Sequence, residues 1–182
     1  ENMYGPAWYS FNVGKIHYIV LNDNYYVGRD YFYIGLIDER QLRWLENDLS
    51  YVPAGSTVVL AMHIPTTLGQ EDRDAFQYGT IGDNLANKTA LYAMLEPYKA
   101  LILSGHMHTS DFQKISDNIS EINIAGLCGA WWCGTTCIDG TPAGYKAFDF
   151  NGDNIKWIYK GCGHKTEYQF NAYIDPDQPG HI

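Results

Sequence analysis

The sequence predicts an α/β domain with mixed sheets, and three patterns indicate it. Two continuous apolar runs, Val58–Met62 and Ala100–Leu103, are typical of strands that are covered on both faces. Between them, apolar residues of Lys88–Tyr98 repeat at helical spacing. Because a strand-helix-strand connection joins parallel strands, the two runs should lie parallel in one sheet. Nearer the carboxyl end, alternating residues around an Asn-Gly pair predict an antiparallel hairpin.

The residues before the first buried strand predict a strand pair and a helix. Trp8–Phe11 and Ile16–Asn22 fit two strands joined by a turn. The aromatic stretch 24–37 has little periodicity and is expected to be irregular. Asp38 should begin a helix, because Gln41 follows three residues later as in a capping box and leucines then repeat at helical spacing.

The last third of the chain predicts antiparallel strands. Glu121–Ala125 alternates in polarity, as do Lys146–Phe150 and Ile155–Tyr159 on either side of Asn151-Gly152. Gln169–Tyr173 fits either a final strand or the start of a linker.

Composition and charge limit the classes of function. The 182 residues are 46% hydrophobic and 18% charged, which is typical of a folded globular chain. The net charge is −9 with only four arginines, which argues against a nucleic-acid groove. A small phosphorylated substrate stays compatible with this charge, because bound metal ions supply positive charge. No apolar run reaches the roughly 18 residues that a membrane helix needs.

The four cysteines form no CxxC pair, so a structural zinc site is not predicted. Disulfides in an exported protein and buried free thiols both stay open as interpretations. The cysteines are Cys128, Cys133, Cys137 and Cys162.

Histidines follow both buried strands. His63 comes directly after the first, and His106 and His108 follow the second after Ser104-Gly105. Because parallel strands end at the same edge of a sheet, and that edge is where open α/β sheets bind ligands, the three imidazoles should converge. We expect Gly105 to let the backbone turn sharply there. Imidazole suits zinc, iron, manganese or nickel, so the sequence predicts a metal site.

The histidine motifs resemble those of a known family. Ala61–Pro65 and Ser104–His108 are similar to two motifs of the calcineurin-like metallophosphoesterases, and 8–23 and 41–45 give weaker support. The Trp- and Gly-rich stretch 129–145 is similar to a bacterial subgroup of this family that has a further C-terminal domain.

This resemblance implies a fold and a dinuclear metal centre. The fold would be part of an α/β/β/α sandwich with mixed sheets. Two divalent or trivalent transition metal ions (Mn, Fe, Zn or Ni) would be the cofactors. His63 and His106 would bind one metal and His108 the other, and a bridging hydroxide would hydrolyse a phosphoric ester.

The resemblance also implies a division of the chain and a substrate cleft. Residues 1–168 would form the C-terminal part of the catalytic domain, and 169–182 a tail or a linker to a further domain. Trp131, Trp132 and Tyr145 would line the cleft for a small phosphorylated substrate. A periplasmic or secreted bacterial protein is favoured, although the sequence does not fix the localisation.

Other motifs of the family do not occur in this chain. Its Asp-x-His, GD and GNH motifs, including the histidine that assists the leaving group, precede the strand that here starts near Trp8. The chain is therefore expected to be an incomplete fragment, inactive alone, whose missing N-terminal half would complete the enzyme. Gly82-Asp83-Asn84 imitates a GD motif but follows no apolar strand, so we interpret it as a loop or the start of a helix. Asp23 and His164 are not expected to bind metal, and His17 is interpreted as structural.

Two other functions stay open. The chain would fit a non-catalytic module that stacks sugars on Trp131, Trp132 and the tyrosines of 25–33. It would also fit a mononuclear zinc hydrolase with the three histidines as ligands and water in the fourth position. Metal content separates the three hypotheses. The dinuclear phosphoesterase requires two metals, the sugar-binding module none, and the mononuclear hydrolase one zinc.

Overall fold

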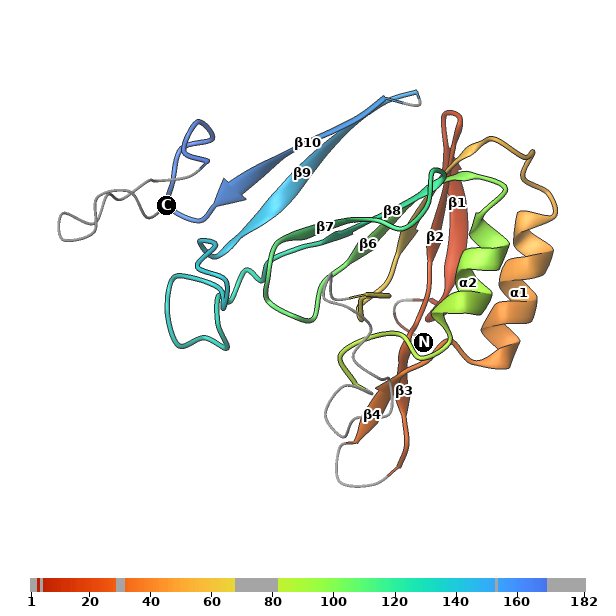
Figure 1. Cartoon of the computed structure of the whole chain (residues 1–182), viewed down its shortest axis with the longest axis horizontal. Coiled ribbons are helices and arrows are strands. Elements are labelled where there is room, and N and C mark those ends of the chain that lie inside the picture. Colours follow the sequence, from red (N-terminus) through yellow and green to blue (C-terminus); the bar gives the residue numbers. More distant parts are fainter. Residues whose placement is uncertain (1–2, 4, 29–31, 68–81, 153, 170–182) are drawn as a thin grey trace.

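The computed structural model describes residues 3, 5–28, 32–67, 82–152 and 154–169. Its centre is a six-stranded sheet in the order β1-β2-β5-β6-β8-β7, and two small two-stranded sheets pair β3 with β4 and β9 with β10 (Figure 1). The elements are β1 Tyr9–Val13, β2 Ile16–Val20, β3 Asn24–Tyr26, β4 Tyr33–Gly35, α1 Glu39–Leu49, β5 Thr57–Ala61, α2 Lys88–Leu95, β6 Lys99–Ser104, β7 Asp111–Lys114, β8 Ile119–Asn123, β9 Gly144–Asn151 and β10 Asn154–Gly161.

The four inner strands of the large sheet are parallel. β5 pairs with β2 on one side and with β6 on the other, and β6 pairs with β8. The edge strands β1 and β7 are antiparallel to their neighbours. The predicted parallel pairing of the two buried runs is confirmed, with Val59 opposite Leu101. Both histidine-bearing segments consequently leave the sheet at one edge.

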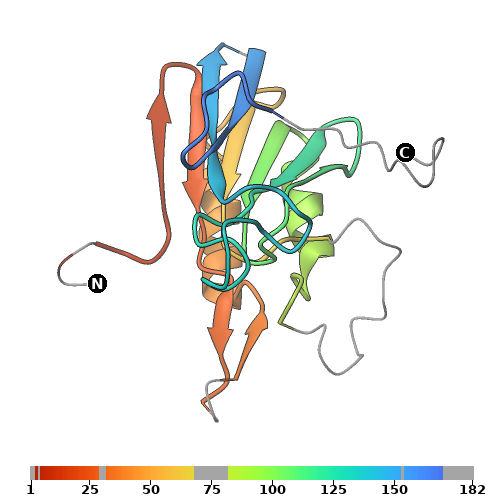
Figure 2. The same cartoon turned by 90° about the vertical axis from the view of Figure 1, so that its left-hand side faces the viewer.

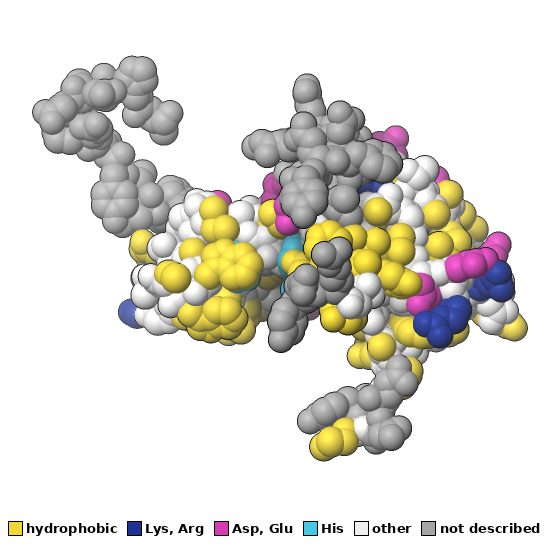
Figure 3. Space-filling model, turned by 90° about the horizontal axis from the view of Figure 1, so that it is seen from below, with side chains coloured by type: hydrophobic (Ala, Val, Ile, Leu, Met, Phe, Trp, Pro, Cys, Tyr) yellow, Lys and Arg dark blue, Asp and Glu magenta, His cyan; other side chains and the backbone are white. Residues whose placement is uncertain are grey.

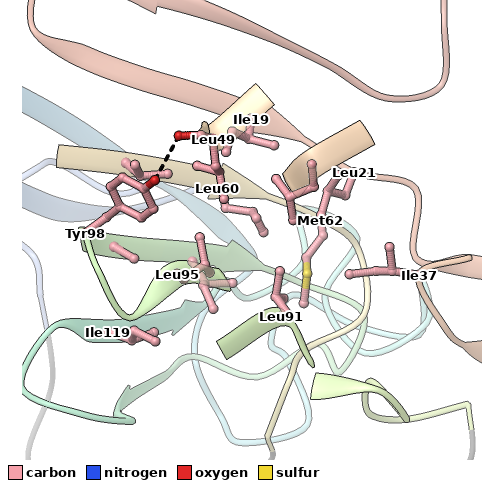
Figure 4. Close-up of a cluster of buried hydrophobic side chains, with 14 of the residues drawn as sticks. Ile19, Leu21, Ile37, Leu49, Leu60, Met62, Leu91, Leu95, Tyr98 and Ile119 are labelled. Atoms are coloured by element: carbon pink, nitrogen blue, oxygen red, sulfur yellow. Dashed lines mark hydrogen bonds between the residues drawn. The ribbon is translucent and has the colours of Figure 1, made fainter. Parts of the chain in front are cut away.

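Both helices cover the same face of the large sheet (Figures 1 and 2). Leu60 and Met62 from β5 and its end pack there with Leu91 and Leu95 of α2 (Figure 4). The Tyr98 hydroxyl donates a hydrogen bond to the carbonyl oxygen of Leu49 at the end of α1, at 2.9 Å. This core fixes β5 and β6 rigidly, and with them the starting points of the histidine loops.

The β9–β10 hairpin lies on the opposite face of the sheet (Figure 2). Its aromatic rings contact the sheet at two places, Phe150 on Tyr18 with centroids 5.7 Å apart and Trp157 on Phe112 at 6.0 Å. The result is a helix layer, a mixed sheet and a strand layer, so the predicted mixed α/β class is confirmed.

Most predicted elements are present, but several differ. The strand expected over Glu121–Ala125 runs over Ile119–Asn123 as β8, and it is parallel to β6 and antiparallel only to β7. The hairpin β3–β4 lies in the stretch that was expected to be irregular, and β7 was not predicted. Helix α2 ends at Leu95 rather than Tyr98. Residues 170–173 of the last predicted segment lie outside the described residues, and Gln169 itself is not in a strand.

The predicted helix start is correct but its capping box is only half formed. Asp38 caps α1 by accepting the backbone N–H of Gln41 at 2.9 Å. The Gln41 side chain instead bonds the backbone N–H and C=O of Asn22, at 3.0 and 2.8 Å. The Gln41 side chain therefore does not bond the backbone of Asp38, as it would in a capping box, but connects α1 to the residues that follow β2.

Two further properties follow from the described residues. None of their helices combines the length and the apolar character that crossing a membrane requires. All four cysteines are free thiols, but Cys137 alone among them is buried, and Cys133 and Cys162 are exposed, so the interpretation as buried free thiols holds for Cys137 only.

Candidate metal centre

The His63 loop is fixed by a buried carboxylate. Asp23, 1% exposed, accepts the backbone N–H of His63 at 3.1 Å and that of Ile64 at 2.7 Å. Burial raises the pKa of Asp23 to about 6, although these backbone hydrogen bonds act to lower it. Asp23 therefore does not present itself as an exposed ligand in this structure; it holds the peptide that carries His63.

A second buried carboxylate fixes the same loop from another side. Glu121 on β8 accepts the backbone N–H of Thr66 at 3.0 Å, the Thr66 hydroxyl, and the Ser104 hydroxyl at 2.6 Å. Ser104 is the last residue of β6, directly before the second histidine motif. Glu121 thus ties the end of β6 to the His63 loop and sets the spacing between the two histidine segments.

His63 and His106 meet at the edge of the sheet. His106 Nδ1 lies 3.1 Å from His63 Nε2, and the ring centroids are 4.9 Å apart. Two imidazole nitrogens that each bind one metal at about 2.0–2.1 Å would lie about 2.9–3.4 Å apart for angles near 90–110°. The donor set and its spacing therefore fit a pair of ligands to a single metal ion.

The pKa values of these two histidines favour the metal-binding form. Burial lowers the pKa of His63, with a further lowering from the charge of His108. Burial and then His63 lower the pKa of His106, against opposing effects of Asp83 and the Gly82 backbone. A lowered pKa keeps imidazole neutral, which is the protonation state that binds a metal.

His106 also contacts a tyrosine and lies in the field of an aspartate. The Tyr33 hydroxyl is 3.3 Å from His106 Nε2, and the two rings meet edge to face at 5.8 Å. Burial raises the pKa of Tyr33, and the charge of Asp83 raises it further. Asp83, which the sequence placed in a loop, is in a turn as expected, and its charge acts on the candidate centre.

The backbone turn in the second motif is made by the histidines themselves. His106 and His108 have φ angles of 69° and 53°, whereas Gly105 is not among the positive-φ residues. The expectation that Gly105 makes the turn is wrong. Gly105 still continues the hydrogen bonding of the sheet. Its carbonyl oxygen accepts a hydrogen bond from the Asn123 side-chain amide at 2.7 Å, and its N–H donates to the His63 carbonyl at 3.0 Å. The turn therefore begins only at His106.

His108 points toward a different loop. Its Nδ1 lies 2.7 Å from the Gly129 carbonyl oxygen, which fixes Nδ1 as the donor and leaves Nε2 with its lone pair. Its ring stacks on Trp131 at 4.9 Å and 24°, and Cys128 Sγ is 3.7 Å from Nδ1. A histidine whose second nitrogen donates to a backbone carbonyl is the usual arrangement of a metal ligand.

The three histidines do not form a single three-ligand cluster. Among residues 3, 5–28, 32–67, 82–152 and 154–169, no three His, Cys, Asp or Glu side chains are placed to hold one metal ion. His63 and His106 are paired, and His108 is held apart by Gly129.

The three predicted substrate-lining residues differ in position. Trp131 stacks on His108, and Trp132 beside it is 80% exposed. Tyr145 on β9 is 48% exposed and lies on the opposite side of its strand from Lys146, whose ammonium group bonds the Asn123 carbonyl at 3.3 Å. Tyr145 therefore faces away from the sheet.

Sequence reasoning missed the supporting carboxylates. Asp23 lies between two asparagines after β2, and Glu121 is the central residue of β8, between Ser120 and Ile122. A carboxylate among buried strand residues needs partners, which is the signal that would have marked Glu121. Nothing in the local sequence shows that Asp83 lies near His106, since a contact across the fold brings them together.

A comparison with solved structures shows what the fold is similar to. The fold is similar to the crystal structure of a dimetal phosphatase from Danio rerio, with a TM-score of 0.51 and 15% identity. The likeness covers 84% of this chain and 60% of that one, so the chain spans less than two thirds of the neighbour's length. This likeness concerns the fold alone, which is a mixed α/β architecture similar to that of the neighbour. No curated protein gives a significant match.

A second comparison finds a family model that is similar to part of the chain. Residues 121–180 match the family model for the C terminal of calcineurin-like phosphoesterase, which is roughly a third of the chain. Over these residues the chain is similar to the C-terminal region of calcineurin-like phosphoesterases.

Proposed function

We propose that this chain supplies part of the dinuclear metal centre of a phosphoric ester hydrolase. The observation that carries the proposal is the 3.1 Å separation of His63 Nε2 and His106 Nδ1 at the carboxyl edge of a parallel sheet. His63 and His106 would hold one metal, and His108 would hold the other through Nε2. Similarity to a calcineurin-like family model and a dimetal phosphatase fold supports this assignment.

The chain's own residues would position the reaction. Asp23 and Glu121 hold the His63 loop, and Gly129 orients His108. When bound, the metal ions supply positive charge to the phosphoryl oxygens and generate a nucleophile from water near neutral pH. The Tyr33 hydroxyl lies 3.3 Å from His106 Nε2 and would donate a hydrogen bond to a substrate oxygen.

We further propose that the remaining ligands come from a segment upstream of residue 1. The family's Asp-x-His, GD and GNH motifs would precede β1, and a histidine of the last motif would assist the leaving group. With two ligands for one metal and one for the other, the chain alone would bind metals weakly and have little activity.

The test uses the complete protein with its upstream segment. Metal analysis should find two metals per protein, and hydrolysis of aryl phosphate mono- and diesters should depend on them. His106→Ala should lose a metal and reduce turnover by several orders of magnitude, whereas His164→Ala, in the loop after β10, should do little. Unchanged turnover in His106→Ala would refute the assignment. One zinc in this chain alone would favour the mononuclear hydrolase instead, and no metal even in the complete protein would favour the sugar-binding module.

A further inference from the structure

Two neighbouring tryptophans after β8 are exposed and strained. Trp131 and Trp132 have 61% and 80% of their surfaces exposed. Their φ angles are 58° and 59°, a region that bulky side chains rarely adopt. Among the described residues, the other non-glycine positions with positive φ are His106 and His108. Strained backbone of this kind gathers at functional sites, so its coincidence with the candidate metal ligands points to a shared role.

The loop that presents these tryptophans has a defined structure. Its backbone is closed by hydrogen bonds from Ala130 N–H to the Thr136 carbonyl at 2.7 Å and from Trp132 N–H to the Cys128 carbonyl at 3.0 Å. Gly129 has a φ of 61°, and a Cβ there would come within 2.8 Å of the Thr136 carbonyl oxygen. The loop is therefore preorganised, and a ligand that meets the indoles would not have to order it.

The same loop is fixed to a candidate metal ligand. Gly129 accepts the hydrogen bond of His108 Nδ1, and the Trp131 ring stacks on the His108 ring. One indole face is thus occupied by His108, and the remaining surface is exposed. Histidine surface appears between two hydrophobic areas on the face shown in Figure 3. Because Trp131 stacks on His108 and Trp132 follows it in the chain, the organic group of an ester whose phosphate is held at the metals would extend toward this loop.

We propose that Trp131 and Trp132 bind the flat face of a ring in the substrate's organic group. The substrate class would be phosphoric esters of ring-bearing alcohols, as opposed to esters of open-chain alcohols such as glycerol. Indole stacks on aromatic rings and on the apolar face of sugar rings, so an aryl or base-like group and a sugar are two sources of the same chemistry. This inference rests on the proposed function, because the metals would anchor the phosphate.

The experiment measures substrate preference in the complete, metal-loaded protein. The substrates are phenyl phosphate, glucose 1-phosphate and glycerol 1-phosphate. Trp132→Leu is the main variant, because Trp132 is highly exposed and has no ring contact with His108. Trp157→Leu is the matched control. Trp157 on β10 is also partly exposed, at 42%, but it stacks on Phe112 of β7 and not on a candidate metal ligand.

We expect Trp132→Leu to lower the kcat/KM ratio of ring-bearing to open-chain substrate by roughly fivefold or more, mainly through KM. Trp157→Leu should leave the ratio as it is. A loss confined to phenyl phosphate or to glucose 1-phosphate supports the proposal and names the ring. An unchanged ratio in both Trp132→Leu and Trp131→Leu overturns it.

A binding measurement separates this failure from failure of the proposed function. Quenching of tryptophan fluorescence is measured with phenyl phosphate, glucose 1-phosphate and inorganic phosphate in the presence of Mn²⁺. If no ester is hydrolysed, the proposed function fails, yet tighter binding of either ring compound than of phosphate, lost in Trp132→Leu, would still support the stacking surface. If esters are hydrolysed but neither ring compound binds more tightly than phosphate, the stacking surface fails and the hydrolase stands.

Discussion

The Asp23 carboxylate accepts the backbone N–H of His63 at 3.1 Å, so a buried acid and a candidate metal ligand from different strand ends are joined through the main chain. The second oxygen accepts the next N–H, of Ile64, at 2.7 Å. Asp23→Ala should cost about 1–3 kcal/mol of unfolding free energy, since two buried N–H groups lose their acceptor. It should also weaken metal binding, because the His63 loop loses its fixed position.

Urea unfolding and metal titration of the Asp23 variants measure these two effects. Asp23→Asn keeps one carbonyl oxygen as an acceptor. It should therefore lose less unfolding free energy and less metal affinity than Asp23→Ala. Equal metal affinity in the wild type and Asp23→Ala would show that the loop holds its position without this carboxylate.

The His63–His106 pair predicts a non-additive effect on metal binding. If both nitrogens bind one ion, His63→Ala or His106→Ala alone should remove most of its affinity, and the double variant should lose little more. Metal content by mass spectrometry and Co²⁺ absorption would follow the loss. Additive losses would mean that the two histidines act on separate ions.

Glu121 predicts a pH dependence of stability. Burial raises the pKa of Glu121 above its ordinary value of 4.5, while hydrogen bonds from Ser104 and Thr66 oppose the rise. The folded state then keeps this proton to higher pH than the unfolded state does. The free energy of unfolding contributed by this group should therefore fall as the pH rises from 4.5 through the folded-state pKa.

Glu121→Gln tests this assignment, because the amide does not titrate. Unfolding midpoints of metal-free protein are compared between about pH 4 and pH 7. The decline of the unfolding midpoint with rising pH should be smaller in Glu121→Gln than in the wild type. Parallel curves would mean that Glu121 does not account for the dependence.

A polar cluster around His17, outside the candidate metal centre, should contribute to stability but not to metal binding. His17 Nε2 lies 2.7 Å from Asp48 on α1, and its Nδ1 lies 2.9 Å from Asn12. The Ser10 hydroxyl donates to the other Asp48 oxygen at 2.7 Å. Asp48→Ala should cost about 1–3 kcal/mol of unfolding free energy, since these partly buried groups lose their partner. Metal uptake should be unchanged, and a loss of metal in this variant would contradict the structural role of His17.

The strands and the histidine pair could be predicted from sequence because their signals are local. Val58–Met62 and Ala100–Leu103 are continuous apolar runs, and the helix between them fixes their parallel direction. That direction alone brings His63 and His106 to one edge. The prediction needed no knowledge of side-chain packing.

The support of the site could not be predicted in the same way. Asp23 and Glu121 act through hydrogen bonds to residues 41 and 55 positions away, which no local pattern records. The turn at His106 and His108 also went against the local rule, because glycine is the residue expected at positive φ. Conflict between local preference and final structure is typical of functional sites.

The origin of the histidine pair on two separate strands has a consequence for how the protein forms. His63 and His106 are 43 residues apart in sequence and become neighbours only when β6 has paired with β5. Bringing the two ends of a segment of this length together costs conformational entropy, and the contacts between β5 and β6 must offset that cost. The His63–His106 pair therefore does not exist in the nascent chain before that pairing, and the speed at which Co²⁺ binds this pair during refolding would report when β5 and β6 pair.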